Sequence, residues 1–417
     1  MDILEDLKAR GLIYQISDEA GLKRALRKKI RLYCGFDPTA GSLHIGNLLL
    51  LVTLKRFQLA GHQPIVVLGG ATGLIGDPSG KTEERKLNSP LIVKKWTKGI
   101  KKQVERILDF KKRGNSALLV NNYTWIGKGK IISFLRDIGK YFTVPYMLAK
   151  ESVRTRLEKG ISFTEFSYML LQAYDFLYLY RKYGCQLEIG GSDQWGNITA
   201  GIDLIRRKTG KDVFGFTVPI VTRADGKKFG KTEKGTIWLE AEKTSPYQFY
   251  QFWINTSDKD VIKYLKYFTF LSLERIKSLE KQMKENPEKR LAQRVLAREV
   301  TTLVHGRKAA ARAEKISQKL FSQKIGDLSR KELEMAFQAI PSVSLKGRTI
   351  LLIDLLLKVG AVSSKRQARE DLENGAISLN GKTEKEGNRL IKKADCLYNK
   401  YLLVKRGKKN YYVVLWK

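Results

Sequence analysis

Residues 33–47 bring several kinds of polar group together in one short segment of the chain. Their side chains include a phenol, a thiol, a carboxylate and an imidazole, from Tyr33, Cys34, Asp37 and His44. The segment follows apolar residues 30–33, passes through a turn rich in Gly, Asp and Pro, and leads into apolar residues 48–52. This pattern predicts a strand, a loop and the start of a helix. Such corners bind ligands in open α/β sheets, and a helix N-terminus favours phosphate.

A second set of polar groups lies on one helical face. Tyr168, Gln172 and Asp175 occur at positions i, i+4 and i+7, so the last two lie within about 40° of Tyr168 around a helix axis. A solvated face is the ordinary interpretation, but this stripe contains no Lys or Glu, which favours a partly buried pocket. A carboxylate with an amide can hold an ammonium, and a carboxylate with a phenol can hold a hydroxyl.

Residues 76–82, G-D-P-S-G-K-T, resemble a phosphate-binding loop without forming one. Ile75 stands where a Walker loop has glycine, and Pro78 removes a backbone donor. The sequence therefore disfavours a nucleoside triphosphatase of that type. The loop still places Asp77 at a strand-to-helix turn, where a lone Asp caps a helix more often than it anchors a ligand.

Two further loops contain groups suited to a nucleotide. Residues 190–197, G-G-S-D-Q-W-G-N, follow a predicted strand; the two glycines allow close approach, and Asp193 could bind ribose hydroxyls. An ordinary turn also explains this motif. Residues 227–232, K-K-F-G-K-T, form a cationic loop with a glycine hinge that could close on a polyphosphate, although such loops are usually only solvated.

Strands and helices alternate around these motifs. We expect strands at residues 30–33, 64–68, 117–120, 187–191 and 213–221, and helices at residues 48–59, 94–110 and 164–180. This alternation predicts right-handed crossovers and a parallel, Rossmann-like α/β sheet.

The pattern changes at residue 245 to consecutive helices, and again near residue 350 to a small α+β unit. We expect four parts: a Rossmann-like domain at 1–245, an α-helical domain at 246–320, a linker at 321–349 and a small domain at 350–417. The last should contain two helices, an Asn-Gly turn at 380–381 and a basic hairpin at 401–415.

The chain of 417 residues carries a strong positive charge. It has 78 Lys or Arg against 42 Asp or Glu, a net charge of +36, which predicts attraction to a polyanion. A proteome-wide preference for Lys explains much of this excess equally well. Residues 341–417 hold 17 Lys or Arg against 7 Asp or Glu, which favours a local nucleic-acid surface there.

Composition also bears on location. The sequence contains no apolar segment long enough to span a bilayer, and its acidic N-terminus is neither a secretory signal nor a transit peptide. Cys34, Cys185 and Cys396 are far apart and form no C-x-x-C pair. We therefore expect no disulfide framework, no zinc finger, no membrane partner and a cytoplasmic location.

Taken in order, five motifs resemble those of a class I aminoacyl-tRNA synthetase. They occupy residues 36–47, 69–81, 164–175, 190–197 and 228–232. The first contains H-I-G-N, similar to the family's His-Ile-Gly-His signature, and the last is K-F-G-K-T, similar to Lys-Met-Ser-Lys-Ser. The chain most resembles the bacterial type of tyrosyl-tRNA synthetase, nearly from end to end.

The resemblance implies a tyrosine pocket with three groups of contacts. The side-chain hydroxyl would contact Tyr33 and Asp175. The α-ammonium would contact Asp77, Tyr168 and Gln172, and the carboxylate would contact Gln194. A pocket built to bond a hydroxyl rejects an amino acid that lacks one, and the discrimination of tyrosyl-tRNA synthetases against phenylalanine is itself the standard example of that rule.

The resemblance also implies a nucleotide site. Its ATP contacts would be Cys34, Gly35, Asp37, Thr39, His44, Gly46, Asn47, Gly191, Asp193 and Lys231. Its catalytic groups would be His44, Asn47, Lys81, Arg85, Lys228 and Lys231. In this scheme Cys34, Gly191 and Asp193 contact the ribose, and Gly46 lets the adenine approach. His44 donates to the phosphates, and the four Lys and Arg side chains lie on two loops that close on pyrophosphate.

The implied reaction is attack of the tyrosine carboxylate on the α-phosphate of ATP, giving tyrosyl-adenylate and pyrophosphate, followed by transfer to the 3′-terminal ribose of tRNA(Tyr). Because the nucleophile is already ionised, the reaction requires positioning and charge stabilisation rather than a general base. ATP would be a substrate accompanied by Mg²⁺. We expect no tightly bound cofactor and no dedicated metal site in the protein.

The family's partners follow from the same resemblance. Residues 246–320 would contact the anticodon arm of tRNA(Tyr), and residues 350–417 resemble an RNA-binding fold shared with a ribosomal small-subunit protein. The family is a homodimer, and Phe163 lies in the segment that resembles its interface, although simple core packing would also explain that side chain. Asn47 and Glu188 depart from the pattern, because they stand where His and, often, Gln are found.

Two other functions stay open at this point. One is a non-enzymatic RNA-binding protein on a synthetase scaffold, and the other is a ligase for a different amino acid. His44, Lys228 and Lys231 argue against an inactive scaffold. Tyr33 and Asp175 argue for tyrosine.

Overall fold

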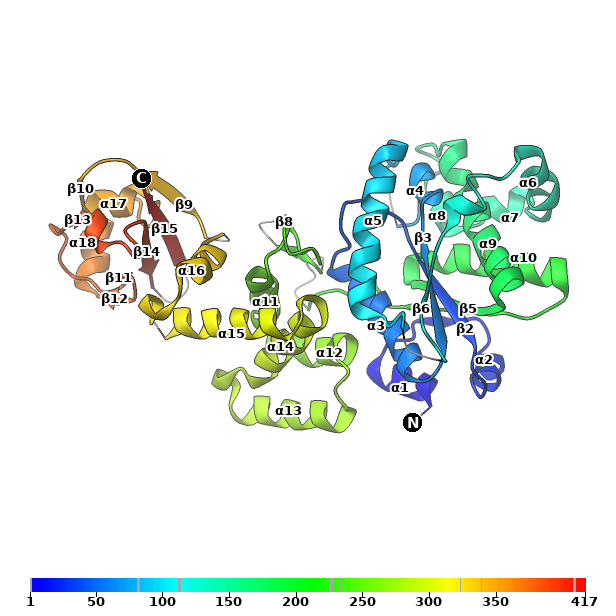
Figure 1. Cartoon of the computed structure of the whole chain (residues 1–417), viewed down its shortest axis with the longest axis horizontal. Coiled ribbons are helices and arrows are strands. Elements are labelled where there is room, and N and C mark those ends of the chain that lie inside the picture. The colour runs from blue at the N-terminus through cyan, green and yellow to red at the C-terminus, as the bar shows by residue number, and fades with distance from the viewer. Residues whose placement is uncertain are drawn as a thin grey trace. The chain divides into compact units, whose positions relative to one another are not determined.

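The structure is a computed structural model that describes residues 2–80, 83–111, 114–224, 229–232, 235–322, 324–338, 340–407 and 410–417. Two compact units form within the chain (Figure 1). The first unit contains Met1–Lys243 and Thr256–Leu296, and the second contains Thr244–Asn255 and Ala297–Lys417. Within the described residues, no helix combines the length and apolar character needed to cross a membrane.

A mostly parallel sheet forms the centre of the first unit. Its strands, as far as the chain is described, are β1 (Gln15–Ile16), β2 (Arg31–Phe36), β3 (Gln63–Leu68), β4 (Leu118–Asn121), β5 (Cys185–Gly191) and β6 (Phe214–Val218). Their order is β1-β6-β5-β2-β3-β4, and β1 is antiparallel to β6 whereas the other neighbours are parallel. The predicted Rossmann-like parallel sheet is confirmed.

Burial on both faces explains why these apolar runs form strands. All six residues of β3 are buried, as is every residue of β6. Helices α3 and α5 cover one side of the strands, and α9 and α10 cover the other (Figure 1). Parallel strands buried on both faces read as continuous apolar segments, as residues 64–68 do.

The helices of the first unit follow the predicted alternation and add several short ones. They are α1 (Ile3–Arg10), α2 (Glu19–Ala25), α3 (Ile45–Leu59), α4 (Thr72–Ile75), α5 (Pro90–Ile107), α6 (Ile131–Asp137), α7 (Val144–Leu148), α8 (Glu151–Arg154), α9 (Phe163–Tyr183), α10 (Trp195–Thr209), α12 (Asp258–Phe268) and α13 (Leu273–Glu285). Helix α14 (Leu291–His305) begins in the first unit and ends in the second.

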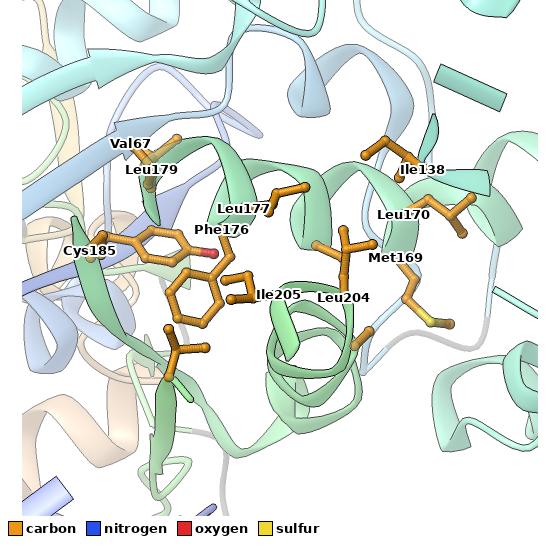
Figure 2. Close-up of a cluster of buried hydrophobic side chains, with 14 of the residues drawn as sticks. Val67, Ile138, Met169, Leu170, Phe176, Leu177, Leu179, Cys185, Leu204 and Ile205 are labelled. Carbon is orange, nitrogen blue, oxygen red and sulfur yellow. The ribbon is translucent and has the colours of Figure 1, made fainter. Parts of the chain in front are cut away.

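Helix α9 has clear start and stop signals. The Ser162 side chain accepts a hydrogen bond from the Glu165 amide, and Gly184 ends the helix with φ of 63°. Figure 2 shows the apolar side chains of α9, among them Phe176 and Leu177, lying against Leu204 and Ile205 of α10. This packing fixes the rotation of α9 about its axis.

Helices α12 and α13 pack with the start of the chain. Arg56 of α3 donates to the carbonyls of Lys266 and Thr269, and Arg10 of α1 donates to the carbonyl of Leu271. These bonds satisfy carbonyls at and beyond the end of α12 with buried guanidinium groups. The helices expected as one domain at residues 246–320 therefore divide between the two units.

The second unit combines helices with a small sheet. Its helices are α11 (Pro246–Ile254), α15 (Arg307–Phe321), α16 (Arg330–Phe337), α17 (Leu352–Lys358) and α18 (Lys365–Glu373). Its strands are β9 (Ser342–Leu345), β10 (Thr349–Leu351), β11 (Ile377–Leu379), β12 (Lys382–Thr383), β13 (Leu390–Lys392), β14 (Tyr401–Arg406) and β15 (Asn410–Trp416). They pair in the orders β12-β11-β14-β15-β9 and β10-β13.

Two features of the C-terminal region match the expected turn chemistry, and one does not match the expected linker. Asn380 and Gly381 both have positive φ and join β11 to β12, and β14 pairs with β15 as the predicted basic hairpin. Residues 321–349, expected as a linker, contain α16 and β9, and β9 pairs in parallel with β15.

Candidate active site

A cavity of about 460 Å³ opens in the first unit where β2 and β5 end. The order of strands reverses between these two neighbours, which is the position where open α/β sheets bind ligands. The predicted site residues in its lining are Tyr33, Cys34, Gly35, Asp37, Thr39, His44, Gly46, Asn47, Asp77, Arg85, Tyr168, Gln172, Asp175, Gly191, Asp193 and Gln194. These are all the predicted site residues whose side chains, or glycine positions, the structure describes.

Three predicted basic residues cannot be placed in this way. Lys81 and Lys228 lie outside the described residues. For Lys231 the backbone is described, in β7 (Lys231–Thr232), which pairs with β8 (Gly235–Thr236).

The H-I-G-N motif forms the N-terminus of α3 through its own side chains. His44 is the cap: its Nδ1 accepts from the Gly46 amide at 3.0 Å, and its backbone amide donates to Oδ1 of Asn47 at 3.1 Å. In neutral His44 the proton must therefore be on Nε2. Asn47 has its oxygen engaged and its Nδ2 remaining as donor. A Cβ at Gly46 would lie 2.7 Å from Cε1 of His44, so glycine is required there.

Backbone hydrogen bonds attach the second signature to the first. The Ile45 amide donates to the Ile237 carbonyl at 3.1 Å, and the Leu239 amide donates to the Leu43 carbonyl at 2.9 Å. The Ile237 amide donates in turn to the carbonyl of Gly230, whose φ is 80°. Gly230 and the residues that follow the K-F-G-K-T motif at 237–239 therefore lie beside the capped start of α3.

The deep end of the cavity holds Asp175. Its Oδ1 accepts from Trp125 Nε1 at 2.7 Å, and its Oδ2 accepts from Asn122 Nδ2 at 3.0 Å. Burial raises the pKa of Asp175 to about 8, and these two hydrogen bonds oppose the rise. Tyr33 lies in the same lining and is 2% exposed. Burial raises the pKa of its phenol as well, so it stays neutral.

Asp37 links two predicted halves of the site. Its Oδ2 accepts from the Tyr168 hydroxyl at 2.6 Å, and its Oδ1 accepts from Thr72 Oγ1 at 2.6 Å. Burial raises the pKa of Asp37 to about 6, against the effect of both bonds. Both of its oxygens are thus engaged by the protein. A Cβ at Gly69 would lie 1.8 Å from Oδ1, so the residue that follows β3 must be glycine.

Asp77 lies in a turn and does not cap a helix. Helix α4 ends at Ile75 and α5 begins at Pro90, so neither start is within its reach. Its Oδ1 accepts from the Ser79 amide at 2.9 Å, and its Oδ2 accepts from Gln194 Nε2 at 2.7 Å. The helix-cap interpretation of this residue is wrong, and the side chain joins the residue 76–80 turn to the short segment between β5 and α10.

Arg85 is fixed at its backbone and side chain. Its Nε donates to the Asp77 carbonyl at 2.9 Å, and its amide donates to Oε1 of Glu165 at 2.8 Å. Glu165 also pairs with Arg156, with 3.0 Å between Oε2 and Nη2. This arrangement places the basic side chain of Arg85 at the edge of the cavity.

Several residues of the site have no counterpart in the predictions. They are Asn122, Trp125, Glu165 and Asn197. The first two follow β4 directly, so a polar group after a strand end was the available signal. Phe163, which was assigned either to the core or to an interface, is 76% exposed and does not pack in the core. In the part of the chain that is described, no group of three or more His, Cys, Asp or Glu could hold a metal ion.

Family models match most of the chain. Residues 25–322 match the model of class I tRNA synthetases for tryptophan and tyrosine. Residues 332–414 match the model of the C-terminal domain of tyrosine–tRNA ligases. The second match includes most of α16 and all of β9, the strand that pairs with β15 in the small sheet.

Individual proteins resemble the chain along its whole length. The tyrosine–tRNA ligase of Desulfitobacterium hafniense is 57% identical over 99% of each chain, and tyrosine–tRNA ligase 1 of Bacillus subtilis is 56% identical over 100% of each. Among solved structures, a C-terminally truncated mitochondrial tyrosyl-tRNA synthetase of Aspergillus nidulans is 31% identical, with a TM-score of 0.70 over 77% of this chain and 94% of that one. The chain belongs to the class I tyrosyl-tRNA synthetase family.

Proposed function

We propose that this chain ligates L-tyrosine to tRNA(Tyr) in two steps, with ATP as the energy source. The tyrosine carboxylate attacks the α-phosphate of ATP and releases pyrophosphate, and the tyrosyl group then passes to the 3′-terminal ribose. The observation that carries this proposal is a single cavity at the point where the strand order of the sheet reverses. Tyr33 and Asp175 line the deep end of this cavity, and the capped start of α3 lines its other end.

Tyrosine would enter with its ring toward the deep end. There its hydroxyl would meet the phenol of Tyr33 and the carboxyl of Asp175. Its ammonium would lie among Asp77, Tyr168 and Gln172, and its carboxylate beside Gln194. Because Asn122 and Trp125 each give one hydrogen bond to Asp175, that carboxyl is held in place before substrate arrives.

ATP would bind across the mouth of the cavity. The ribose would lie near Cys34, Gly191 and Asp193, and the adenine near Gly46. The loop that would bind the nucleotide contains Gly35, Asp37 and Thr39. With Nδ1 occupied by the Gly46 amide, His44 presents Nε2–H toward phosphate, and Asn47 presents Nδ2–H. Two side-chain donors and a helix N-terminus then meet the α-phosphate where charge develops.

Pyrophosphate stabilisation would come from the two basic loops. Arg85 and Lys81 belong to one loop, and Lys228 and Lys231 belong to the other. Mg²⁺ would arrive with the phosphates of ATP. Since the nucleophile is a carboxylate, these charges need only hold the transferring group in line and offset its growing negative charge.

The remaining parts of the proposal concern tRNA, assembly and location. Residues 246–320 would contact the anticodon arm, and residues 350–417 would add a basic RNA-binding surface. The protein would act as a cytoplasmic homodimer. Exposed apolar side chains near the start of α9, including Leu157 and Phe163, support a partner copy on that face of the first unit.

The decisive experiment is tyrosine-dependent exchange between ATP and pyrophosphate with the purified full chain. Exchange that requires tyrosine and fails with phenylalanine supports the assignment. Loss of tyrosine exchange in an Asp175→Ala variant, with retained folding, supports the pocket. Absence of exchange in the unaltered protein would favour an RNA-binding scaffold. Tyrosine exchange undiminished by Asp175→Ala would refute the pocket.

A further inference from the structure

Three amide side chains form a continuous chain of hydrogen bonds along one wall of the cavity. Asn197 Nδ2 donates to Oε1 of Gln172 at 3.0 Å and to Oε1 of Gln194 at 3.2 Å. Gln194 Nε2 donates to Oδ2 of Asp77 at 2.7 Å, and Gln172 Nε2 donates to Oε1 of Glu188 at 2.9 Å. A carboxyl group therefore stands at each end, and we call this set the amide relay.

The two carboxyl ends leave the amide relay with one self-consistent orientation. A carboxylate oxygen can only accept, so each Gln must turn its NH2 group toward its carboxylate and its oxygen toward Asn197. Asn197 is 3% exposed and supplies donors to both oxygens. If either Gln rotated by half a turn, two oxygens would face each other at one end and two NH2 groups at the other.

Glu188 itself is placed beside the phenol of Tyr33. The two residues are register partners on the parallel neighbours β2 and β5, so their side chains leave the sheet on the same face. Glu188 is 1% exposed and Tyr33 is 2% exposed. The Oε2 atom of Glu188 and the hydroxyl of Tyr33 are both buried without a hydrogen-bond partner of regular geometry. Buried polar atoms of this kind require a reason, because each costs free energy.

We propose that Glu188 is a positioning residue for amino-acid binding, which sets the orientation of the Gln172 amide through the amide relay and supports the Tyr33 phenol. This inference rests on the proposed function, in which Gln172 and Tyr33 touch the amino acid. With Glu188 accepting, Gln172 must present its oxygen on the side of Asn197 and the cavity, where an α-ammonium can donate to it. A Gln at position 188 can offer either an oxygen or an NH2 group, so it leaves both orientations of Gln172 available.

The ionisation of Glu188 adds a dependence on pH. Burial raises its pKa to about 7, and the neighbouring Gln172 amide and Tyr33 phenol oppose this rise. The titratable groups around it are Tyr33 and Cys34 on β2, Cys185 on β5 and Asp175 on α9. The thiols and the phenol stay neutral near pH 7 because burial raises the pKa of each. Ionised Glu188 accepts more strongly from Gln172, so tyrosine binding should tighten as pH rises through 7.

The test compares Glu188→Gln with the unaltered full chain. We expect the Kd for tyrosine, measured by calorimetry without ATP, and the KM for tyrosine in exchange to rise about 3- to 10-fold, the worth of one hydrogen bond. The kcat and the KM for ATP should change less than about twofold, because no nucleotide contact is altered. The tightening of tyrosine binding near pH 7 should disappear in this variant.

Asn197→Asp tests the amide relay from its middle. It replaces the shared donor by an acceptor that faces two amide oxygens, so the Kd for tyrosine should rise more than in Glu188→Gln. Thr217→Val is the matched control, because Thr217 is a fully buried polar side chain of β6 that bonds Gln15 outside the cavity. It should reproduce any general loss of thermal stability without changing the Kd.

The outcomes separate this inference from the proposed function. Tyrosine binding that weakens in both relay variants supports the inference even if the unaltered protein shows no exchange. An unchanged Kd and pH profile in Glu188→Gln, or an unchanged Kd in Asn197→Asp, overturns it even if exchange is normal. Failure of the unaltered protein to bind tyrosine overturns both.

Discussion

Arg156 and Glu165 form an ion pair in the interior of the first unit, with 3.0 Å between Nη2 and Oε2 and at most 4% of either side chain exposed. The other oxygen of Glu165 accepts from the amide of Arg85, and Nη1 of Arg156 donates to the carbonyl of Glu83. The pair thus ties the segment that carries Arg85 to the first turn of α9. A buried charge that loses its partner is costly, which makes this link easy to test.

Glu165→Gln should destabilise the protein by about 3 kcal/mol, because Arg156 would stay buried without a counter-charge. It should also lower the kcat of exchange, since Arg85 would be less firmly held, while the KM for tyrosine changes little. Urea unfolding and steady-state exchange measure the two effects. Glu5→Gln is the control, because its pair with Lys23 is exposed and should leave the unfolding free energy within error. Equal stability of the two variants would contradict the prediction.

Trp125→Phe should weaken discrimination between tyrosine and phenylalanine about tenfold, the order of one buried hydrogen bond. The variant keeps an aromatic ring stacked on Tyr178 but removes the donor to Asp175. Since that hydrogen bond lowers the pKa of Asp175, the pKa should rise above its present value of about 8. The ratio of kcat/KM for the two amino acids measures the effect. Tyr178→Phe preserves the stacking and the donor, so a similar loss there would contradict the explanation.

Asp175 should make the free protein less stable as pH rises. Burial raises the pKa of this carboxyl from about 3.8 to about 8, so between these values the folded state holds a proton that the unfolded state has released. Folding therefore binds protons, and stability falls toward pH 8 by up to about 1.4 kcal/mol per unit of pH. Asp175→Asn removes this group, and its urea midpoint should fall less between pH 5 and pH 8. If the urea midpoints of the two proteins fell equally between pH 5 and pH 8, Asp175 would be ionised in both the folded and the unfolded state, and the prediction would be wrong.

Phe163→Asp should convert the proposed homodimer to a monomer, because it would bury a carboxylate in an apolar interface. Sedimentation equilibrium of the full chain measures the mass. Phe321→Asp is the control, since Phe321 is 89% exposed on the second unit and should leave the mass unchanged. A dimeric Phe163→Asp protein would place the interface elsewhere.

Removal of residues 325–417 should spare exchange and weaken tRNA charging. The cut is placed before α16 because Tyr401 of β14 donates to Glu334 at 2.6 Å and β9 completes the small sheet. Loss of the basic region should reduce charging about tenfold at physiological salt and flatten its salt dependence, since fewer phosphates are neutralised. Aminoacylation at two ionic strengths is the measurement. Charging equal to that of the full chain would remove residues 325–417 from the tRNA surface.

Local sequence predicted the strands and helices in which a single requirement, such as burial or helical periodicity, determines most of the residue types. Residues 64–68 are apolar throughout because β3 is buried at every position. The helix around residues 164–180 was recognisable because Ser162 caps it and its apolar residues recur at the helical period. The polar stripe of Tyr168 and Asp175 could be assigned to a pocket since no long charged side chain interrupts it.

The residues that escaped prediction act through partners distant in the sequence. Trp125 and Asn122 acquire a role only when β4 and α9 bring them to Asp175, and no spacing rule links those segments. Asp77 looked like a helix cap in the sequence, but the helix that follows it begins only at Pro90. The helices after residue 245 divide between two units because Arg10 and Arg56 bind carbonyls beyond α12, which only tertiary structure reveals.

The two backbone hydrogen bonds between residues 43–45 and residues 237–239 can form only after Leu239 has been synthesised. The capped corner leaves the ribosome early, but the segment that pairs with it follows almost two hundred residues later. Such a distant pairing forms late in folding. A nascent chain that stops before Ile237 lacks both hydrogen bonds, so the nucleotide corner cannot be completed until that segment has been made.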